Sequence, residues 1–312
     1  MLVPLLKKGD TIGIVSPSNI MTDYKKELLD NTTQVIEKMG LKIRLGEHAR
    51  SIDKYGVSAG EPKERASDIN QMFLDPSIKA IWCAQGGDTA NQVLELLDYE
   101  TITNNPKIFI GLSDNTTLLN GIYKKTGLVT FHGPDAKAGK TSEYFDSEYS
   151  HEEFKRRFIK GSKNIGERDT KIIRPGKAKG ILLGGNLRCL LKLAGTGYMP
   201  DFTGAILLLE DYSSNIKSTL FLLTQMRQMG IFDKISGVVT GQIYGMDTEK
   251  QYDGKGNRIY FEEILLDITS DYNFPILKVD AFGHKCPSTF LPIGAMAEMD
   301  SGFRLTGSFH KA

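Results

Sequence analysis

The sequence IFIGLSDNTTLL, residues 108–119, begins as a buried β-strand pattern and continues as an amphipathic helix that Gly127 ends. Ser113 therefore falls in a tight turn between strand and helix. A hydroxyl in such a turn projects from the carboxyl end of the strand, beside a backbone N–H that can bind an oxyanion. The turn suits a nucleophile, although Asn115 stands where a nucleophile elbow has glycine. In the alternative interpretation, Ser113 or Asp114 only caps the helix.

The flanking segments predict a parallel α/β layer. Apolar strand patterns at 11–16, 41–45, 78–84 and 128–131 alternate with helical patterns at 24–39 and 61–73. Ligands bind at the carboxyl edge of such sheets. The turn after the first strand lacks G-x-G-x-x-G, so no dinucleotide site is expected there.

The loop after residue 84 reads Gln85-Gly86-Gly87-Asp88. Paired glycines at a strand end let the backbone approach a ligand closely, and their N–H groups can hold an anion. We therefore expect Gly86 and Asp88 to line a substrate site. The alternative is an ordinary turn that needs positive φ.

Composition limits the function. The 312 residues suggest about two domains, and 40% hydrophobic and 25% charged residues are typical of a globular protein. The formal net charge of +1 disfavours a nucleic-acid polymer or an anionic membrane as partner. We expect no transmembrane helix and no secretory signal. Cys83, Cys189 and Cys286 are too sparse for a disulfide framework or a zinc site and favour a reducing cytoplasm.

A serine nucleophile needs a base and a carboxylate that orients it. Of five histidines, His132 and His284 each follow a strand in a turn with glycine, and the residues alone leave both open. Glu210 ends a strongly apolar strand pattern at 205–209, which makes it the candidate carboxylate; the alternative is a strand-end charge that reaches solvent.

Seven blocks carry a specific resemblance. They are GDTIGIVSPS, DINQMFLDPSIKAIWCAQGGD, NPKIFIGLSDNTTLL and GLVTFHGP, then GGNLRCLLKLAGTGYMPDFTGAILLLED, LTQMRQMGIFDKISGVVTGQ and GHKCPSTFLPIGAMAEMD. In these blocks, which cover most of the chain, the sequence resembles the serine LD-carboxypeptidase family. That family includes muramoyltetrapeptide carboxypeptidases and a branch that confers resistance to microcin C.

The resemblance implies a catalytic triad and an oxyanion hole. The triad would be Ser113 as nucleophile, Glu210 as orienting carboxylate and His284 as base, and the oxyanion hole would be the N–H groups of Gly87 and Asp114. The family's chemistry implies no metal or organic cofactor. The implied fold is α/β. It has a flavodoxin-like N-terminal domain (1–135) with a mostly parallel sheet, a linker (136–179), and a β-rich, swivelling-barrel-like α/β C-terminal domain (180–312).

The implied activity is release of a terminal D-amino acid from murein tetrapeptides during cytoplasmic peptidoglycan recycling, by a homodimer. The alternative substrate is a peptidyl- or aminoacyl-nucleotide, as in the resistance branch. Two departures bear on this choice: Asp88-Thr89 stands where carboxypeptidases often have Tyr-Gly, and residues 213–215 read Ser-Ser-Asn where many members have a second glutamate. An aromatic stack for a nucleobase would come from Tyr144, Phe145 or Tyr149.

Overall fold

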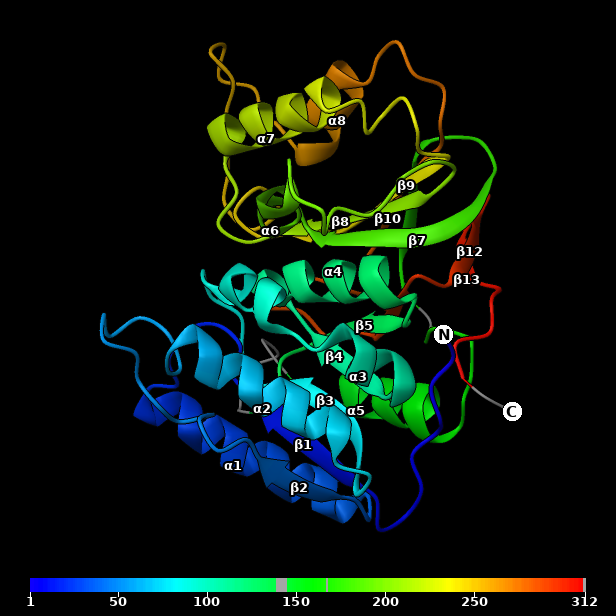
Figure 1. Cartoon of the computed structure of the whole chain (residues 1–312). Coiled ribbons are helices and arrows are strands. Elements are labelled where there is room, and N and C mark those ends of the chain that lie inside the picture. The colour runs from blue at the N-terminus through cyan, green and yellow to red at the C-terminus, as the bar shows by residue number, and fades with distance from the viewer. Residues whose placement is uncertain (139–144, 167, 311–312) are drawn as a thin grey trace.

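The computed structural model describes residues 1–138, 145–166 and 168–310. These residues form a six-stranded and a seven-stranded β-sheet, with helix α4 between them (Figure 1). The strands of the first sheet are β1 (Thr11–Val15), β2 (Lys42–Leu45), β3 (Ile78–Cys83), β4 (Ile108–Gly111), β5 (Thr130–His132) and β11 (Leu291–Ile293). The strands of the second are β6 (Thr170–Arg174), β7 (Ala178–Asn186), β8 (Ile206–Asp211), β9 (Gly237–Ile243), β10 (Ile276–Val279), β12 (Met296–Met299) and β13 (Phe303–Leu305).

The helices connect and cover these strands. The α-helices are α1 (Asp23–Lys38), α2 (Pro62–Leu74), α3 (Tyr99–Asn104), α4 (Thr116–Thr126), α5 (Glu148–Phe154), α6 (Leu187–Leu190), α7 (Ile216–Gln228) and α8 (Phe261–Ile268). Three short 3₁₀ helices are η1 (Ala90–Leu96), η2 (Ser113–Asn115) and η4 (Leu191–Leu193), and η3 (Lys155–Ile159) is a π-helix. The described helices are all too short or too polar to span a bilayer.

The first sheet confirms the flavodoxin-like prediction. Its strands run in the order β11-β5-β4-β3-β1-β2, and β1 to β5 are mutually parallel. The central strands are buried along nearly their whole length, because helices cover both faces of a parallel sheet. The order of connection reverses between β1 and β3, and ligands bind at such a switch point. β11 adds an antiparallel edge from the end of the chain.

The second sheet is mixed, in the order β13-β12-β7-β8-β9-β10-β6. Strands β7 to β10 are parallel, whereas β6 and β12 pair antiparallel with β10 and β7. Helix α4 joins the two halves of the molecule. On α4, Asn120 donates to the carbonyl of Gly184 at 2.8 Å and accepts from its amide at 3.1 Å.

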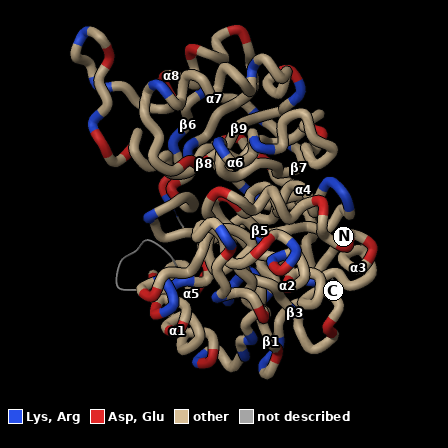
Figure 2. The backbone as a smooth tube through the Cα atoms, turned by 60° about the vertical axis from the view of Figure 1, so that its left-hand side comes forward, with Lys and Arg blue, Asp and Glu red and all other residues tan. Residues whose placement is uncertain are grey.

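Residues 136–179 contain α5, η3 and β6. β6 joins the second sheet, whereas the rings of Phe145 and Phe154 pack against Trp82 of the first sheet, with centroids 4.8 and 5.4 Å away. Charged residues of both signs are interspersed along the chain, in keeping with the small net charge (Figure 2).

Candidate active site

Ser113 lies on a strained turn between β4 and α4. Its φ is 59°, and only Ser213 and Lys285 share a positive φ among the described residues other than glycine. Non-glycine residues adopt this conformation when the surrounding structure holds them there, as in a nucleophile elbow. Gly111 permits the sharp turn, because a Cβ there would lie 2.6 Å from that of Asn115.

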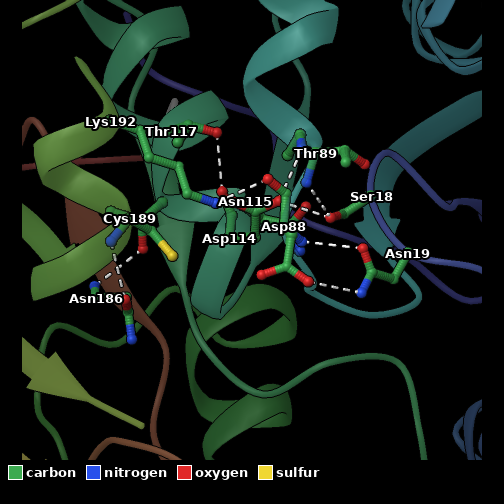
Figure 3. Close-up of polar contacts among 12 residues, drawn as sticks. Ser18, Asn19, Asp88, Thr89, Asp114, Asn115, Thr117, Asn186, Cys189 and Lys192 are labelled. Carbon is green, nitrogen blue, oxygen red and sulfur yellow. Dashed lines mark hydrogen bonds and ion pairs between the residues drawn. The ribbon is translucent and has the colours of Figure 1, made fainter. Parts of the chain in front are cut away.

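The carboxylate of Asp114 fixes this turn from three directions. It accepts hydrogen bonds from the Ser18 hydroxyl at 2.6 Å and the Ala90 amide at 2.7 Å, and pairs with the Lys192 ammonium at 2.6 Å (Figure 3). Neither N-cap position, Leu112 of η2 or Asn115 of α4, makes a side-chain capping bond. The alternative in which Ser113 or Asp114 only caps the helix is therefore wrong.

The two glycines of the loop after β3 permit close contact with Ser113 and Asn19. A Cβ on Gly86 would lie 2.6 Å from the Cβ of Ser113, and Gly87 has φ 151° with its Cβ position only 2.2 Å from the Asn19 side chain. The N–H groups of Gly87 and Asp114 donate to no other group in the described part of the chain. Both are available to a substrate oxygen.

Asp88 directly follows the two glycines in the same loop. Its side chain accepts from the Asn19 amide at 3.0 Å, and its backbone N–H donates to Asn19 at 3.0 Å (Figure 3). Sequence reasoning assigned no role to Asn19, although it follows β1 at the switch point, which is the signal that could have identified it.

His284 and Glu210 form a buried pair. The His284 Nδ1 lies 2.6 Å from the Glu210 Oε2, and their side chains are 13% and 0% exposed. Burial by itself lowers the pKa of His284, but the charge and hydrogen bond of Glu210 outweigh it and raise that pKa above 6.5. Burial likewise opposes ionisation of Glu210, but the positive charge of His284 outweighs it and lowers the Glu210 pKa below 4.5.

Ser113 and His284 line one cavity of 320 Å³ together with Gly86, Gly87 and Asp88. No hydrogen bond joins the serine hydroxyl to the imidazole within the described residues. Such bonds are often long without substrate and tighten in the reactive complex. A second cavity of 410 Å³ shares Gly87, Asp88 and Ser113 but lacks His284.

His132, the other histidine left open by the sequence, lies apart from both cavities. It is fully buried, neither ring nitrogen has a hydrogen-bond partner among the described residues, and burial lowers its pKa to about 4. His132 is therefore neutral at neutral pH. Its location favours His284 as the base.

Two of the three aromatic residues expected to stack on a nucleobase, Phe145 and Tyr149, line neither cavity. Phe145 is buried against Trp82, and the Tyr149 ring is covered by the Arg168 guanidinium at 3.9 Å, so both predictions are wrong. Tyr144 lies outside the described residues.

A different aromatic pair borders the site, and sequence reasoning missed it. The Tyr212 ring stacks on Tyr244 with centroids 5.1 Å apart, and lies 4.8 Å from the ring of His284. Tyr212 is 41% exposed and lines both cavities. Its position directly after the Glu210-Asp211 strand end was the available signal.

Comparison with known proteins gives consistent matches. Residues 12–133 match the LD-carboxypeptidase N-terminal domain, and residues 179–299 match the LD-carboxypeptidase C-terminal domain. The chain is 32% identical to a probable murein peptide carboxypeptidase of Bacillus subtilis, over 95% of this chain and 90% of that protein. It is 31% identical to the microcin C7 self-immunity protein MccF of Escherichia coli, over 96% and 93%.

The fold matches as closely. A solved structure of MccF in complex with glutamyl sulfamoyl guanosine superposes with a TM-score of 0.88 at 27% identity, covering 99% of both chains. The expected two-domain α/β fold class is thereby confirmed.

Proposed function

Since this chain belongs to the LD-carboxypeptidase family, we propose that it is a serine peptidase that releases the terminal D-amino acid of murein tetrapeptides. The observation that carries the proposal is the His284–Glu210 pair, which meets the strained Ser113 turn at one cavity. The name of the Bacillus subtilis relative supports murein peptide as the substrate class.

In the proposed reaction, the neutral imidazole of His284 takes the hydroxyl proton of Ser113 as the oxygen attacks the carbonyl carbon of the L–D peptide bond. Glu210 holds the imidazole through Nδ1 and stabilises its charged form. The tetrahedral oxyanion accepts hydrogen bonds from the Gly87 and Asp114 amides, each worth about 2.7–4 kcal/mol in comparable enzymes.

Collapse of this intermediate breaks the C–N bond, and His284 gives its proton to the departing amine. A water molecule then attacks the acyl-enzyme on Ser113 with the same base, which frees the tripeptide acid and restores the serine. These steps require no metal or organic cofactor.

The direct test is Ser113→Ala, with release of D-alanine from a murein tetrapeptide as the measurement. We expect loss of release, together with loss of labelling by a fluorophosphonate. Ser301→Ala, an exposed serine outside both cavities, is the matched control and keeps the wild-type rate. Unchanged release in Ser113→Ala would exclude the proposal.

A second candidate substrate is an aminoacyl- or peptidyl-nucleotide. It is supported by the similarity to MccF, one structure of which contains a glutamyl sulfamoyl nucleoside, and by the exposed Tyr212 ring beside His284. The same triad would cleave the bond between the aminoacyl carbonyl and the nucleotide. The ratio of kcat/KM values for a murein tetrapeptide and an aminoacyl-nucleotide decides between the two substrates.

The organisation of the chain is part of the proposal. The nucleophile would belong to a domain of residues 1–135, and Glu210 and His284 to a domain of residues 180–312, with 136–179 between them. The two family matches support this division. A cytoplasmic location is supported by three buried cysteines without disulfides, and light scattering would test the expected homodimer.

A further inference from the structure

The cavity that holds Ser113 and His284 is rich in lysine. Lys25 of α1, Lys137 and Lys285 all line it, opposed by the carboxylates of Asp88 and Asp135. These five groups sum to one positive charge. In the second cavity Arg188 and Lys192 are balanced by Asp88 and Asp211.

Lys25 and Lys137 lie close enough to each other to interact electrostatically. Lys137 is only 3% exposed, and its ammonium lies 3.2 Å from the Asp135 Oδ2. The Asp135 carboxylate in turn accepts a hydrogen bond from the Gly86 backbone amide at 3.4 Å. Burial lowers the pKa of Lys25, and the charge of Lys137 lowers it further. An anion entering beside Lys25 would relieve this repulsion and replace lost water contacts.

The position of His284 indicates which of the two cavities receives the leaving group. The imidazole must reach the leaving nitrogen to protonate it, so the leaving group has to lie on the His284 side of Ser113. Only the lysine-rich cavity is lined by His284, whereas the second cavity is lined by Ser113 without His284. The lysine-rich cavity is therefore the one that can receive the leaving group.

We infer that the lysine-rich cavity is a subsite for a leaving group that carries a negative charge close to the scissile nitrogen. This inference rests on the proposed roles of Ser113 and His284. Lys25 and Lys285 contact the anion, and the Lys137–Asp135 pair positions the loop that carries Gly86. Both proposed substrates meet this requirement, through the free carboxylate of a terminal D-amino acid or the phosphoryl group of a nucleotide.

The test measures binding and needs no turnover. On Ser113→Ala protein, calorimetry compares D-alanine with D-alaninamide, and AMP with adenosine. We expect the member that bears the carboxylate or phosphate group in one pair to bind on the order of tenfold more tightly, as for a hydrogen bond to a charged group. Preference for D-alanine identifies the carboxylate, and preference for AMP identifies the phosphoryl group. Equal binding within both pairs overturns the inference.

Variants then assign the effect to the lysines. Lys25→Gln should weaken binding of the ligand that bears the anionic group about tenfold without weakening binding of the partner that lacks this group, whereas Lys25→Arg should retain most of the affinity. Lys285→Gln provides a second, independent removal of charge, and Lys255→Gln, in an exposed turn far from the cavity's lining, is the control. Equal losses for both members of the pair would overturn the assignment.

Turnover separates this inference from the proposed function. In otherwise wild-type protein, the Lys25→Gln change should raise KM for the anionic substrate while kcat and fluorophosphonate labelling of Ser113 persist. Absence of labelling in the wild type would count against the serine mechanism. The binding comparison would still decide whether the cavity selects anions.

Discussion

Replacing Glu210 by Gln removes the charge that opposes the protonated His284 but keeps the size of the side chain. The Glu210 oxygen lies 2.6 Å from the imidazole nitrogen, and the carboxylate is fully buried. Opposite charges centred about 4 Å apart attract by about 4 kcal/mol at an effective dielectric constant of about 20. Because the imidazole becomes charged in the proposed reaction, this loss corresponds to a decrease of about 10³-fold in kcat/KM.

The same substitution changes the pH dependence, and its sign follows from the pair. The base works only when neutral, so wild-type kcat/KM should rise with pH through the raised pKa of His284, which lies above 6.5. Without the charge of Glu210, burial of the imidazole is less strongly opposed and its pKa decreases. The acid limb of the profile therefore moves to lower pH in Glu210→Gln, while the plateau decreases.

The assay is the pH profile of kcat/KM for the better substrate, with unfolding by urea measured on the same samples. Glu153→Gln is the matched control, because Glu153 is equally buried but bonds Thr289 and Arg156 away from the cavity. It should change stability without moving the acid limb. An unmoved limb in Glu210→Gln would refute the assignment of Glu210 and His284 as the coupled pair.

Three further changes test other parts of the site. Gly86→Ala places a methyl group 2.6 Å from the Cβ of the nucleophile and should reduce kcat by about 10²-fold or more with normal circular dichroism, whereas Gly254→Ala, which meets no atom within 4 Å, should change nothing. Lys192→Met leaves the buried Asp114 carboxylate without its cation and should lower the free energy of unfolding by about 2–4 kcal/mol in urea titrations, although its two neutral hydrogen bonds remain. His132 has a pKa of about 4 in the folded state, so the unfolded state binds a proton at this histidine first as pH falls. Protonation of His132 in the unfolded state should therefore reduce the free energy of unfolding by about 3 kcal/mol between pH 6.5 and 4. The His132→Phe variant should lack this pH dependence.

Much of the first domain could be predicted because its signals are local. Buried runs alternating with helices give the parallel layer, and Gly127 does end α4 in the left-handed conformation with φ 70°. The carboxyl ends of β1, β3 and β4 were each expected at one edge, and Ser18, Gly86 and Ser113 follow them there.

The choice between the two histidines could not be predicted because it depends on a distant strand. β11 is three residues long, too short for a periodic pattern, yet it pairs Leu291 with His132. This pairing covers the outer edge of β5 and encloses His132. His284 follows β10 in the other sheet and remains at a cavity.

The aromatic residues near 145 were assigned wrongly for a similar reason. Phe145 and Tyr149 stand in a polar, charged stretch, where local composition does not indicate burial. Phe145 instead packs with Phe154 against the single tryptophan, a contact more than sixty positions away in sequence. Aromatic rings pack into the core wherever the chain passes close to it, so local composition does not predict whether they are buried.

The Asp114 carboxylate explains how Ser113 can be held in an unfavourable backbone conformation. A residue with φ near 60° tends to relax unless its neighbours fix it. Asp114 bonds Ser18 from the loop after β1, Ala90 at the start of η1, and Lys192 from the half of the chain that supplies Glu210 and His284. In the proposed mechanism the Asp114 amide binds the oxyanion, and the Asp114 side chain ties both halves of the molecule together. The strain at Ser113 and the placement of its partners then depend on the same buried contacts.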